Sequence, residues 1–309
     1  MTDKALKNLA ASIRVRLLNY AREHGDDYQR ILTRYAIERL LFRLSQTEAV
    51  EHYILKGAML FVAWPEHPFR PTRDLDLLGH GDPDPDVISE LFTRICQVEA
   101  PDDGIVFDAA TLKVEPVRET DKYQGIRLSL KGYLAKVLIP VQVDIGFGDH
   151  IFPPAKRQTF PNLLPDLPTA NIQMYPPETV IAEKFEAMIR FGKINGRIKD
   201  FYDIWIIIRM FEFDLPDLVK AVGGTFQRRK TDIPTETPVG LTETFADIAE
   251  KSGLWSGFLR RSPPTLQPPP FVDLLQELRR FFYPVIESLA LPKVTEARWD
   301  PNRKAWLER

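Results

Sequence analysis

Two aspartates stand one residue apart in "RPTRDLDLLG" (residues 70–79), and this spacing is the first sign of chemistry in the chain. The segment is otherwise rich in leucine and predicts a β-strand, in which alternate side chains point to the same side. Asp74 and Asp76 are therefore expected on one face. Two parallel carboxylates repel each other unless a cation or a shared proton compensates them. The pair predicts a site for a cation.

A third acid, Asp144, lies in "VQVDIGFGD", which alternates in period two and also predicts a strand. The valines and the isoleucine of this segment form one predicted face, and Asp144 belongs to the other. If the two strands are neighbours, three carboxylates converge, and such oxygen ligands suit Mg²⁺. Two ions of this kind can clamp the attacking and leaving oxygens of a phosphoryl transfer. The alternative is a polar strand surface that faces solvent.

Upstream, "YILKGAMLF" predicts a short strand, a turn at Gly57 and a helix that ends near Trp64. Backbone N–H groups at the start of a helix bind anions, and Lys56 adds a positive charge beside them. A phosphate site is therefore expected next to the cation site. The alternative is a simple turn.

The remaining pattern predicts an α+β fold, in which a mixed sheet is followed by a helical lobe. Helical periodicity covers residues 4–23 and 27–45 before the acids, and β patterns fill 104–147. Prolines between 152 and 177 predict a connector, and helices are expected at 178–191, 200–212, 214–222, 241–260 and 271–290. The expected domains are N-terminal helices (1–50), a β/α lobe (51–150), a proline-rich connector (151–177) and a helical C-terminal lobe (178–300).

Composition favours a soluble cytoplasmic protein. The chain has a single cysteine, Cys96, and shows neither a signal peptide nor an apolar run of transmembrane length. Its formal net charge of −2 excludes a global basic field for nucleic acid. An RNA partner would need local basic clusters such as "QRRK" (227–230), although such clusters are more often solvated helix faces.

At this point four segments resemble a known family. They are "YILKGAMLF", "RPTRDLDLLG", "VDIGFGD" and "ETVIAEKFEAMIRFGKINGRIKDFYDIW". Together, over about residues 50–210, they are similar to the AbiEii/AbiGii toxins, a branch of the DNA-polymerase-β-like nucleotidyltransferases found in bacterial toxin–antitoxin and phage-defence loci. The resemblance implies a polymerase-β-like nucleotidyltransferase lobe.

The resemblance also implies roles for individual residues of the first lobe. Lys56, Gly57 and Ala58 match the glycine motif that holds the triphosphate, and Ala58 replaces a glycine or serine that is common there. Arg70 and Thr72 match the Arg-x-Ser/Thr that precedes the acids and contacts the nucleotide. Asp74 and Asp76 match the metal-binding pair, and Asp144 matches the third metal-binding carboxylate, which also takes the proton of the attacking hydroxyl.

Two later motifs complete the implied site. Lys184 borders the apolar stripe of its predicted helix, as a snorkelling lysine also would, and the resemblance gives it the incoming triphosphate. In "KDFYDIW", Asp200 with Asp203 three residues later reads as a helix N-cap with an acidic third residue. The resemblance places Lys199 and Asp200 at the active cleft, Lys199 as a nucleotide contact and Asp200 as a catalytic residue.

The function implied is transfer of a nucleoside monophosphate from an NTP to a hydroxyl, with Mg²⁺ or Mn²⁺ and with release of pyrophosphate. The implied acceptor is the 3′ end of tRNA, and the implied partner is a cognate antitoxin; no membrane is involved. Within the same chemistry, the acceptor could be a protein or a small-molecule hydroxyl such as that of an aminoglycoside. A non-catalytic binding module and a metal-dependent nuclease are rival classes, but a nuclease leaves the glycine turn without a purpose.

Overall fold

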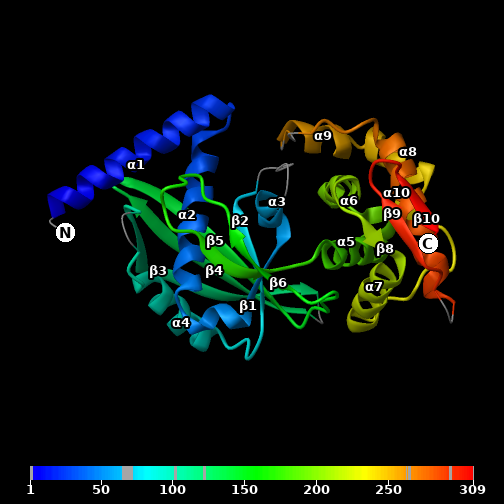
Figure 1. Ribbon diagram of the computed structural model, residues 1–309, viewed down its shortest axis with the longest axis horizontal. Helices are drawn as coiled ribbons and strands as arrows, with labels where there is room; N and C mark the ends of the chain where they lie inside the picture. Colours follow the sequence, from blue (N-terminus) through cyan, green and yellow to red (C-terminus); the bar gives the residue numbers. More distant parts are fainter. Residues whose placement is uncertain are drawn as a thin grey trace. The chain divides into compact units, whose positions relative to one another are not determined.

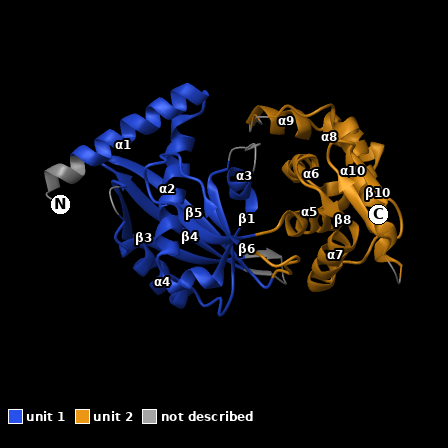
Figure 2. Ribbon diagram, viewed as in Figure 1, with its two compact units in different colours: residues 1–67, 71–148, 156–174 blue, residues 68–70, 149–155, 175–309 orange. Residues whose placement is uncertain are grey.

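The fold is that of a computed structural model, which describes residues 3–64, 72–100, 103–120, 123–261, 263, 266–291 and 294–308 (Figure 1). The chain forms two compact units (Figure 2). Unit 1 comprises residues 1–67, 71–148 and 156–174, and unit 2 comprises 68–70, 149–155 and 175–309.

Unit 1 is built on a seven-stranded mixed sheet with the order β3-β4-β5-β2-β1-β7-β6. Its elements are α1 (Asp3–His24), α2 (Tyr28–Ser45), a 3-10 turn (Glu48–His52), β1 (Tyr53–Lys56), a 3-10 turn (Gly57–Met59), α3 (Leu60–Ala63), β2 (Asp74–Gly79), α4 (Pro85–Gln97), β3 (Ile105–Thr120), β4 (Tyr123–Leu134), β5 (Val137–Phe147), β6 (Lys156–Phe160) and β7 (Ala170–Met174).

Helix α2 is the central helix of unit 1. It packs against β5 and β7, and α4 packs against β3. Apolar side chains of α2 are almost wholly buried, and so is Arg43, whose guanidinium donates to Asp103 at 2.6 and 3.2 Å. This buried pair fixes the loop before β3 to α2, since a buried charge is tolerated only with a partner.

The segment 151–177, expected to be a connector, instead supplies two strands of the sheet. The alternating residues Ala170, Ile172 and Met174 of β7 are buried, and β7 pairs with β1 in parallel and with β6 in antiparallel fashion. The prolines lie before, between and after the two strands, where they cost no ladder hydrogen bond. The expectation of a connector was wrong. It rested on the number of prolines, whereas the short period-two pattern of β7 indicates a strand.

Unit 2 is mainly helical. Its elements are α5 (Pro177–Phe191), a 3-10 turn (Gly192–Ile194), α6 (Ile198–Met210), β8 (Phe213–Asp214), α7 (Leu215–Arg229), a 3-10 turn (Val239–Leu241), α8 (Glu243–Lys251), α9 (Leu254–Arg261), α10 (Phe271–Leu289), β9 (Ala297–Asp300) and β10 (Ala305–Glu308). Aromatic rings fill its core; Phe185 of α5 stacks on Phe282 of α10 with ring centroids 4.0 Å apart.

Two details of unit 2 differ from the expectation. The helix expected at 241–260 is divided into α8 and α9, and Gly253 at the division has a φ of +68°, a left-handed conformation that ends a helix. The C-terminal hairpin β9–β10 was not expected. It joins β8 in a three-stranded sheet, and Trp299 donates to the carbonyl of Ile208 at 2.6 Å.

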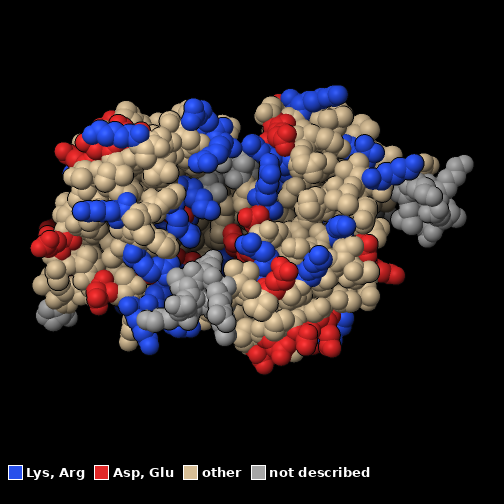
Figure 3. All heavy atoms as spheres, turned by 180° about the vertical axis from the view of Figure 1, so that it is seen from behind, with Lys and Arg blue, Asp and Glu red and all other residues tan. Residues whose placement is uncertain are grey.

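These observations confirm the expected fold class, a mixed sheet followed by helices. No helix among the described residues has the length and apolar character needed to cross a bilayer. Basic and acidic side chains are interspersed over the face shown in Figure 3, in keeping with the net charge of −2.

Candidate active site

The three acids singled out in the sequence lie on neighbouring strands of unit 1. Strand β2 pairs with β5 in parallel, and the register places Asp76 beside Asp144 and Asp74 beside Gln142. Asp74, Asp76 and Asp144 are half-buried, whereas the residues between them in each strand are buried. Paired residues share a face, so all three carboxylates lie on the same face of the sheet.

One cross-strand row contains two of these acids and two cations. Lys56 of β1 pairs with Asp76 of β2, Asp76 with Asp144 of β5, and Asp144 with Arg127 of β4. We call these four residues the acid row. Its charges run positive, negative, negative, positive across four adjacent strands. A cation thus flanks each end of the acid pair, which offsets the repulsion between the carboxylates.

The expected turn at Gly57 lies directly against this row. Gly57 has a φ of +71°, and a Cβ atom built there would be 1.9 Å from Oδ2 of Asp76. Only glycine fits, because the position combines a left-handed backbone with contact to a carboxylate. The helix ends at Ala63, next to the expected end at Trp64, but it consists of a single 3-10 turn and the four-residue α3. The candidate anion contacts here are therefore backbone N–H groups and Lys56, with little contribution from a helix dipole.

Asp144 is held by the residue at the end of the acid row. Arg127 donates from Nε to Asp144 Oδ1 at 2.7 Å and from Nη2 to Oδ2 at 2.9 Å. Gln142 Nε2 donates to the same Oδ2 at 3.1 Å. A bidentate arginine–carboxylate pair is both strong and specific in geometry. It fixes the carboxylate at a point next to Asp76.

The donor set suits a hard divalent cation, since it consists of carboxylate oxygens on one face. Over the ranges described, however, no three His, Cys, Asp or Glu side chains are arranged to hold a metal ion. Both oxygens of Asp144 accept hydrogen bonds from Arg127. A carboxylate oxygen has two lone pairs, so a metal shared by all three acids would bind Asp144 either beside the Arg127 guanidinium or in its place.

Three further residues were expected in this part of the site: Ala58, Thr72 and Arg70. Ala58 is buried in the 3-10 turn after Gly57. Thr72 is half-buried just before β2, and Arg73 beside it is exposed. Arg70, expected to contact the nucleotide, lies outside the described residues.

The motif residues of α5 and α6 come together within unit 2. Lys184 donates from Nζ to Asp200 Oδ1 at 2.6 Å and to Asp203 Oδ2 at 2.8 Å. The two carboxylates are 3% and 0% exposed and the lysine 13%. Lys184 is therefore more than a snorkelling side chain, because it ties α5 to α6 through two buried charges. Asp203 contacts it as directly as Asp200 does.

Asp200 was wrongly interpreted as a helix N-cap. Helix α6 begins at Ile198, and its N-cap residue is Arg197, which makes no side-chain capping bond. Asp200 instead accepts from Arg197 Nε at 2.6 Å. Burial on its own would raise the pKa of Asp200, but Lys184 and Arg197 outweigh burial and lower that pKa well below its ordinary value. Lys199 is exposed.

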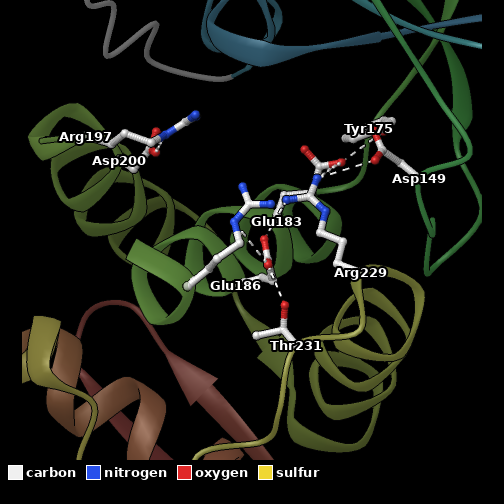
Figure 4. A network of polar contacts seen from close by, with 9 residues as sticks. Asp149, Tyr175, Glu183, Glu186, Arg197, Asp200, Arg229 and Thr231 are labelled. Carbon is white, nitrogen blue, oxygen red and sulfur yellow. Dashed lines mark hydrogen bonds and ion pairs between the residues drawn. The ribbon is translucent and has the colours of Figure 1, made fainter. Parts of the chain in front are cut away.

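A second buried network in unit 2 surrounds Arg229 (Figure 4). Its guanidinium lies 2.8 Å from Glu186, 3.4 Å from Asp149 and 3.5 Å from Glu183. Tyr175 donates to Asp149 at 3.1 Å. The side chain of Arg229 is only 12% exposed. This arginine of the "QRRK" cluster thus joins α7 to α5 and is not part of a solvated basic patch.

Arg127 is the residue that sequence reasoning missed at the acid row. The signal was present in "IRLSL", whose alternation places Arg127 and Ser129 on the face opposite Ile126 and Leu128. What the sequence does not contain is the pairing of β4 with β5, which brings Arg127 beside Asp144.

The chain was compared with curated proteins, solved structures and protein families. No curated protein matches the chain. Among solved structures, JHP933 from Helicobacter pylori aligns with 13% identity and a TM-score of 0.42, over 76% of this chain and 93% of that one. A candidate nucleotidyltransferase from H. pylori aligns with 14% identity and a TM-score of 0.41, over 82% of this chain and 98% of that one.

The family comparison is the decisive one. Residues 39–277 match the family described as "Nucleotidyl transferase AbiEii toxin, Type IV TA system". The match spans more than half of the chain and includes the glycine turn, the acid row and the buried lysine–aspartate cluster. The chain therefore belongs to the AbiEii family of nucleotidyltransferase toxins.

Proposed function

We propose that the protein transfers a nucleoside monophosphate from an NTP to the 3′-terminal hydroxyl of tRNA. The acceptor oxygen forms a bond to the α-phosphorus, and the bond from that phosphorus to the bridging oxygen breaks. Pyrophosphate leaves, and the hydroxyl proton passes to a carboxylate of the acid row, for which Asp144 is the candidate. Positioning and charge neutralisation supply most of the catalysis in reactions of this class.

The contact between Gly57 and Asp76 is the observation that carries the proposal. A phosphate held on the backbone of the Gly57 turn and on Lys56 would lie next to a carboxylate, which only a shared cation makes favourable. An acid that touches a phosphate-binding turn is expected of an enzyme that works on a metal–nucleotide complex. A solvated polar strand has no need of this contact.

Asp74, Asp76 and Asp144 are the residues that would hold Mg²⁺, with Mn²⁺ as a substitute. When bound, the metal supplies charge neutralisation and alignment of the phosphate oxygens. Lys56 and the backbone at Gly57 and Ala58 bind the triphosphate. Arg127 orients Asp144 through its bidentate bond.

Lys184, Lys199 and Asp200 complete the proposal, because the family resemblance gives them roles in nucleotide transfer. The buried pairing of Lys184 with Asp200 and Asp203 also gives the lysine a structural role. A test of catalysis at these positions must therefore measure stability in parallel.

Modification of the tRNA 3′ end would stop aminoacylation and growth, as a toxin requires. We therefore infer a cognate antitoxin as partner, a role in phage defence, and action in the cytoplasm, where NTPs and tRNA are found. A toxin of this kind has to be held in check in the cell that makes it.

The test is a denaturing gel of tRNA incubated with the protein, Mg²⁺ and each labelled NTP in turn. Transfer lengthens and labels the tRNA, whereas a nuclease shortens it. Total cell protein and an aminoglycoside are offered in parallel reactions. Label in protein or in the aminoglycoside, with tRNA unchanged, would contradict the tRNA acceptor.

Asp76→Asn is the control variant, because it keeps the shape of the side chain and removes its charge. It should abolish both labelling of tRNA and growth arrest on expression in a bacterium. Equal growth arrest by wild type and variant would support a non-catalytic binding module.

A further inference from the structure

A cavity of about 460 Å³ opens beside Asp74 within unit 1, and none of the roles given above uses it. Its walls come from α2, β3, β4, β5, the first residue of β2 and the residue before it. Asp74 is the one proposed metal ligand among the lining residues. The cavity therefore begins at the proposed reaction centre and extends away from it.

A second cross-strand row forms part of this cavity. Lys113 of β3 pairs with Ser129 of β4, Ser129 with Gln142 of β5, and Gln142 with Asp74 of β2. Paired residues share a face, and neighbouring strands are about 4.8 Å apart. The row thus leads from Asp74 across three strand spacings, roughly 14 Å, to a lysine.

The charge of the cavity is positive although the chain is slightly acidic. Arg73, Lys113 and Lys131 line it against the single carboxylate of Asp74. All three cations are exposed, so they can meet phosphates that enter from solvent. A cationic acceptor such as an aminoglycoside would be repelled here, whereas a polyanion would be attracted.

Between the cations, the lining combines apolar side chains, Leu130, Pro140 and Val141, with neutral groups that can form hydrogen bonds. Ser129 and Gln142 lie on the row itself, and Gln29 and Thr33 of α2 form another part of the wall. Hydroxyl and amide groups of this kind can donate to and accept from sugar hydroxyls and base edges. The combination of spaced cations and neutral polar groups fits a nucleotide strand.

The position of the cavity decides which substrate it serves. The attacking and leaving oxygens of a phosphoryl transfer lie roughly in line, on opposite sides of the phosphorus. The Gly57 turn borders Asp76 from β1, on one side of β2, whereas the cavity spreads over β5, β4 and β3 on the other side. If pyrophosphate leaves on the side of the turn, the acceptor has to enter from the side of the cavity.

We propose that this cavity is the acceptor site and that it binds the 3′-terminal nucleotides of an RNA strand. Arg73, Lys113 and Lys131 contact the backbone phosphates, and Ser129 and Gln142 contact the terminal nucleoside. The proposal rests on the proposed function and adds to it the residues that select a polynucleotide over a protein or small-molecule acceptor.

The test uses a Lys113→Gln/Lys131→Gln double variant of the full chain, with steady-state kinetics measured separately for tRNA and for NTP. The KM for tRNA should rise at least about tenfold, and the slope of log(kcat/KM) for tRNA against log[salt] should become less negative by about two. The KM for NTP should stay within twofold. Lys156→Gln is the matched control, since Lys156 is an exposed lysine on β6, at the opposite edge of the sheet.

A binding measurement separates this proposal from the proposed function. Fluorescence anisotropy of a labelled single-stranded RNA ending in a free 3′-hydroxyl reports the Kd of each protein without any turnover. Weaker binding by the double variant and unchanged binding by the control support the cavity even if no transfer to tRNA is detected. Wild-type transfer to tRNA with unaltered tRNA kinetics and RNA binding in the double variant would overturn the cavity alone. A rise in the KM for NTP alone would assign the cavity to the incoming nucleotide and overturn the proposal.

Discussion

Gly57, in the turn after β1, is in contact with Asp76 of the neighbouring strand β2: a Cβ atom at Gly57 would lie 1.9 Å from Oδ2 of Asp76. The strand register places Lys56, the preceding residue, directly opposite the same aspartate. Phosphate-binding turn and acid are thus parts of one local structure, and a change in either one moves the other.

Gly57→Ala should reduce nucleotide transfer at least about 100-fold, because the added methyl group displaces the Asp76 carboxylate, and a displacement of about 1 Å has this effect on catalysis. The measurement is pyrophosphate release with NTP and tRNA. Gly25→Ala is a close control, since Gly25 has a φ of +64° but no atom within 4 Å of an added Cβ. It should lose about 1 kcal/mol of stability through backbone strain and keep its activity. Equal activity losses in the two variants would show that strain, and not contact with Asp76, is responsible.

Arg127→Met should lower the half-saturating Mg²⁺ concentration by about three- to tenfold, because it removes a cation that competes for the oxygens of Asp144. A metal titration of transfer activity measures the effect. Arg157→Met is the control, as Arg157 pairs with Glu51 on the surface at 2.6 Å and 36% exposure. An unchanged or higher Mg²⁺ requirement in Arg127→Met would contradict competition between Arg127 and the metal and leave Arg127 with only the orienting role at Asp144.

Lys184→Met should destabilise the protein by about 3–5 kcal/mol, because it removes the shared partner of two buried carboxylates. Urea unfolding gives the free energy. Lys220→Met removes an exposed lysine, 61% accessible and 3.4 Å from Asp217, and should change stability by less than about 0.5 kcal/mol. If Lys184→Met lost transfer activity while remaining as stable as wild type, the lysine would be catalytic and not structural.

The lowered pKa of Asp200 predicts that the protein loses stability in acid. Its folded-state pKa lies below the ordinary value of 3.8, so the folded state binds fewer protons than the unfolded state at low pH. The stability that this group contributes is fully present above about pH 5 and decreases as the pH falls below 3.8 towards the folded-state value. Unfolding free energies measured between pH 3 and pH 6 should therefore fall less steeply in Asp200→Asn than in wild type. Parallel curves for the two proteins would contradict the depressed pKa.

Much of the fold could be predicted from the sequence, because its elements have strong local patterns. The period-two strands β2, β4 and β5 and the amphipathic helices α5 and α10 lie within a few residues of their expected ranges. Strands β6 and β7 were missed because short strands between prolines resemble a linker. The strands of the hairpin β9–β10 are about as short as β6 and β7. Their pairing with β8 does not follow from any local sequence pattern.

The candidate site, like the fold, could be predicted from the sequence only where local patterns determine it. Spacing alone places Asp74 and Asp76 on one face, because it depends only on the geometry of a single strand. The partners of Asp144 and Lys184 depend on which elements become neighbours, and this is decided by packing over the whole unit. The sequence therefore led to the acids and the lysine but not to Arg127, whose role arises from the pairing of β4 with β5.

The order in which the sheet of unit 1 is completed has a consequence for synthesis on the ribosome. Strand β1, which carries the phosphate-binding turn, pairs with β2 on one side and with β7 on the other, yet β7 follows a passage of the chain through unit 2 at residues 149–155. Until Met174 has been translated, β1 remains an open edge of an unfinished sheet. Open edges favour aggregation, so we expect prematurely terminated translation products to be targets for degradation and not fragments with toxin activity.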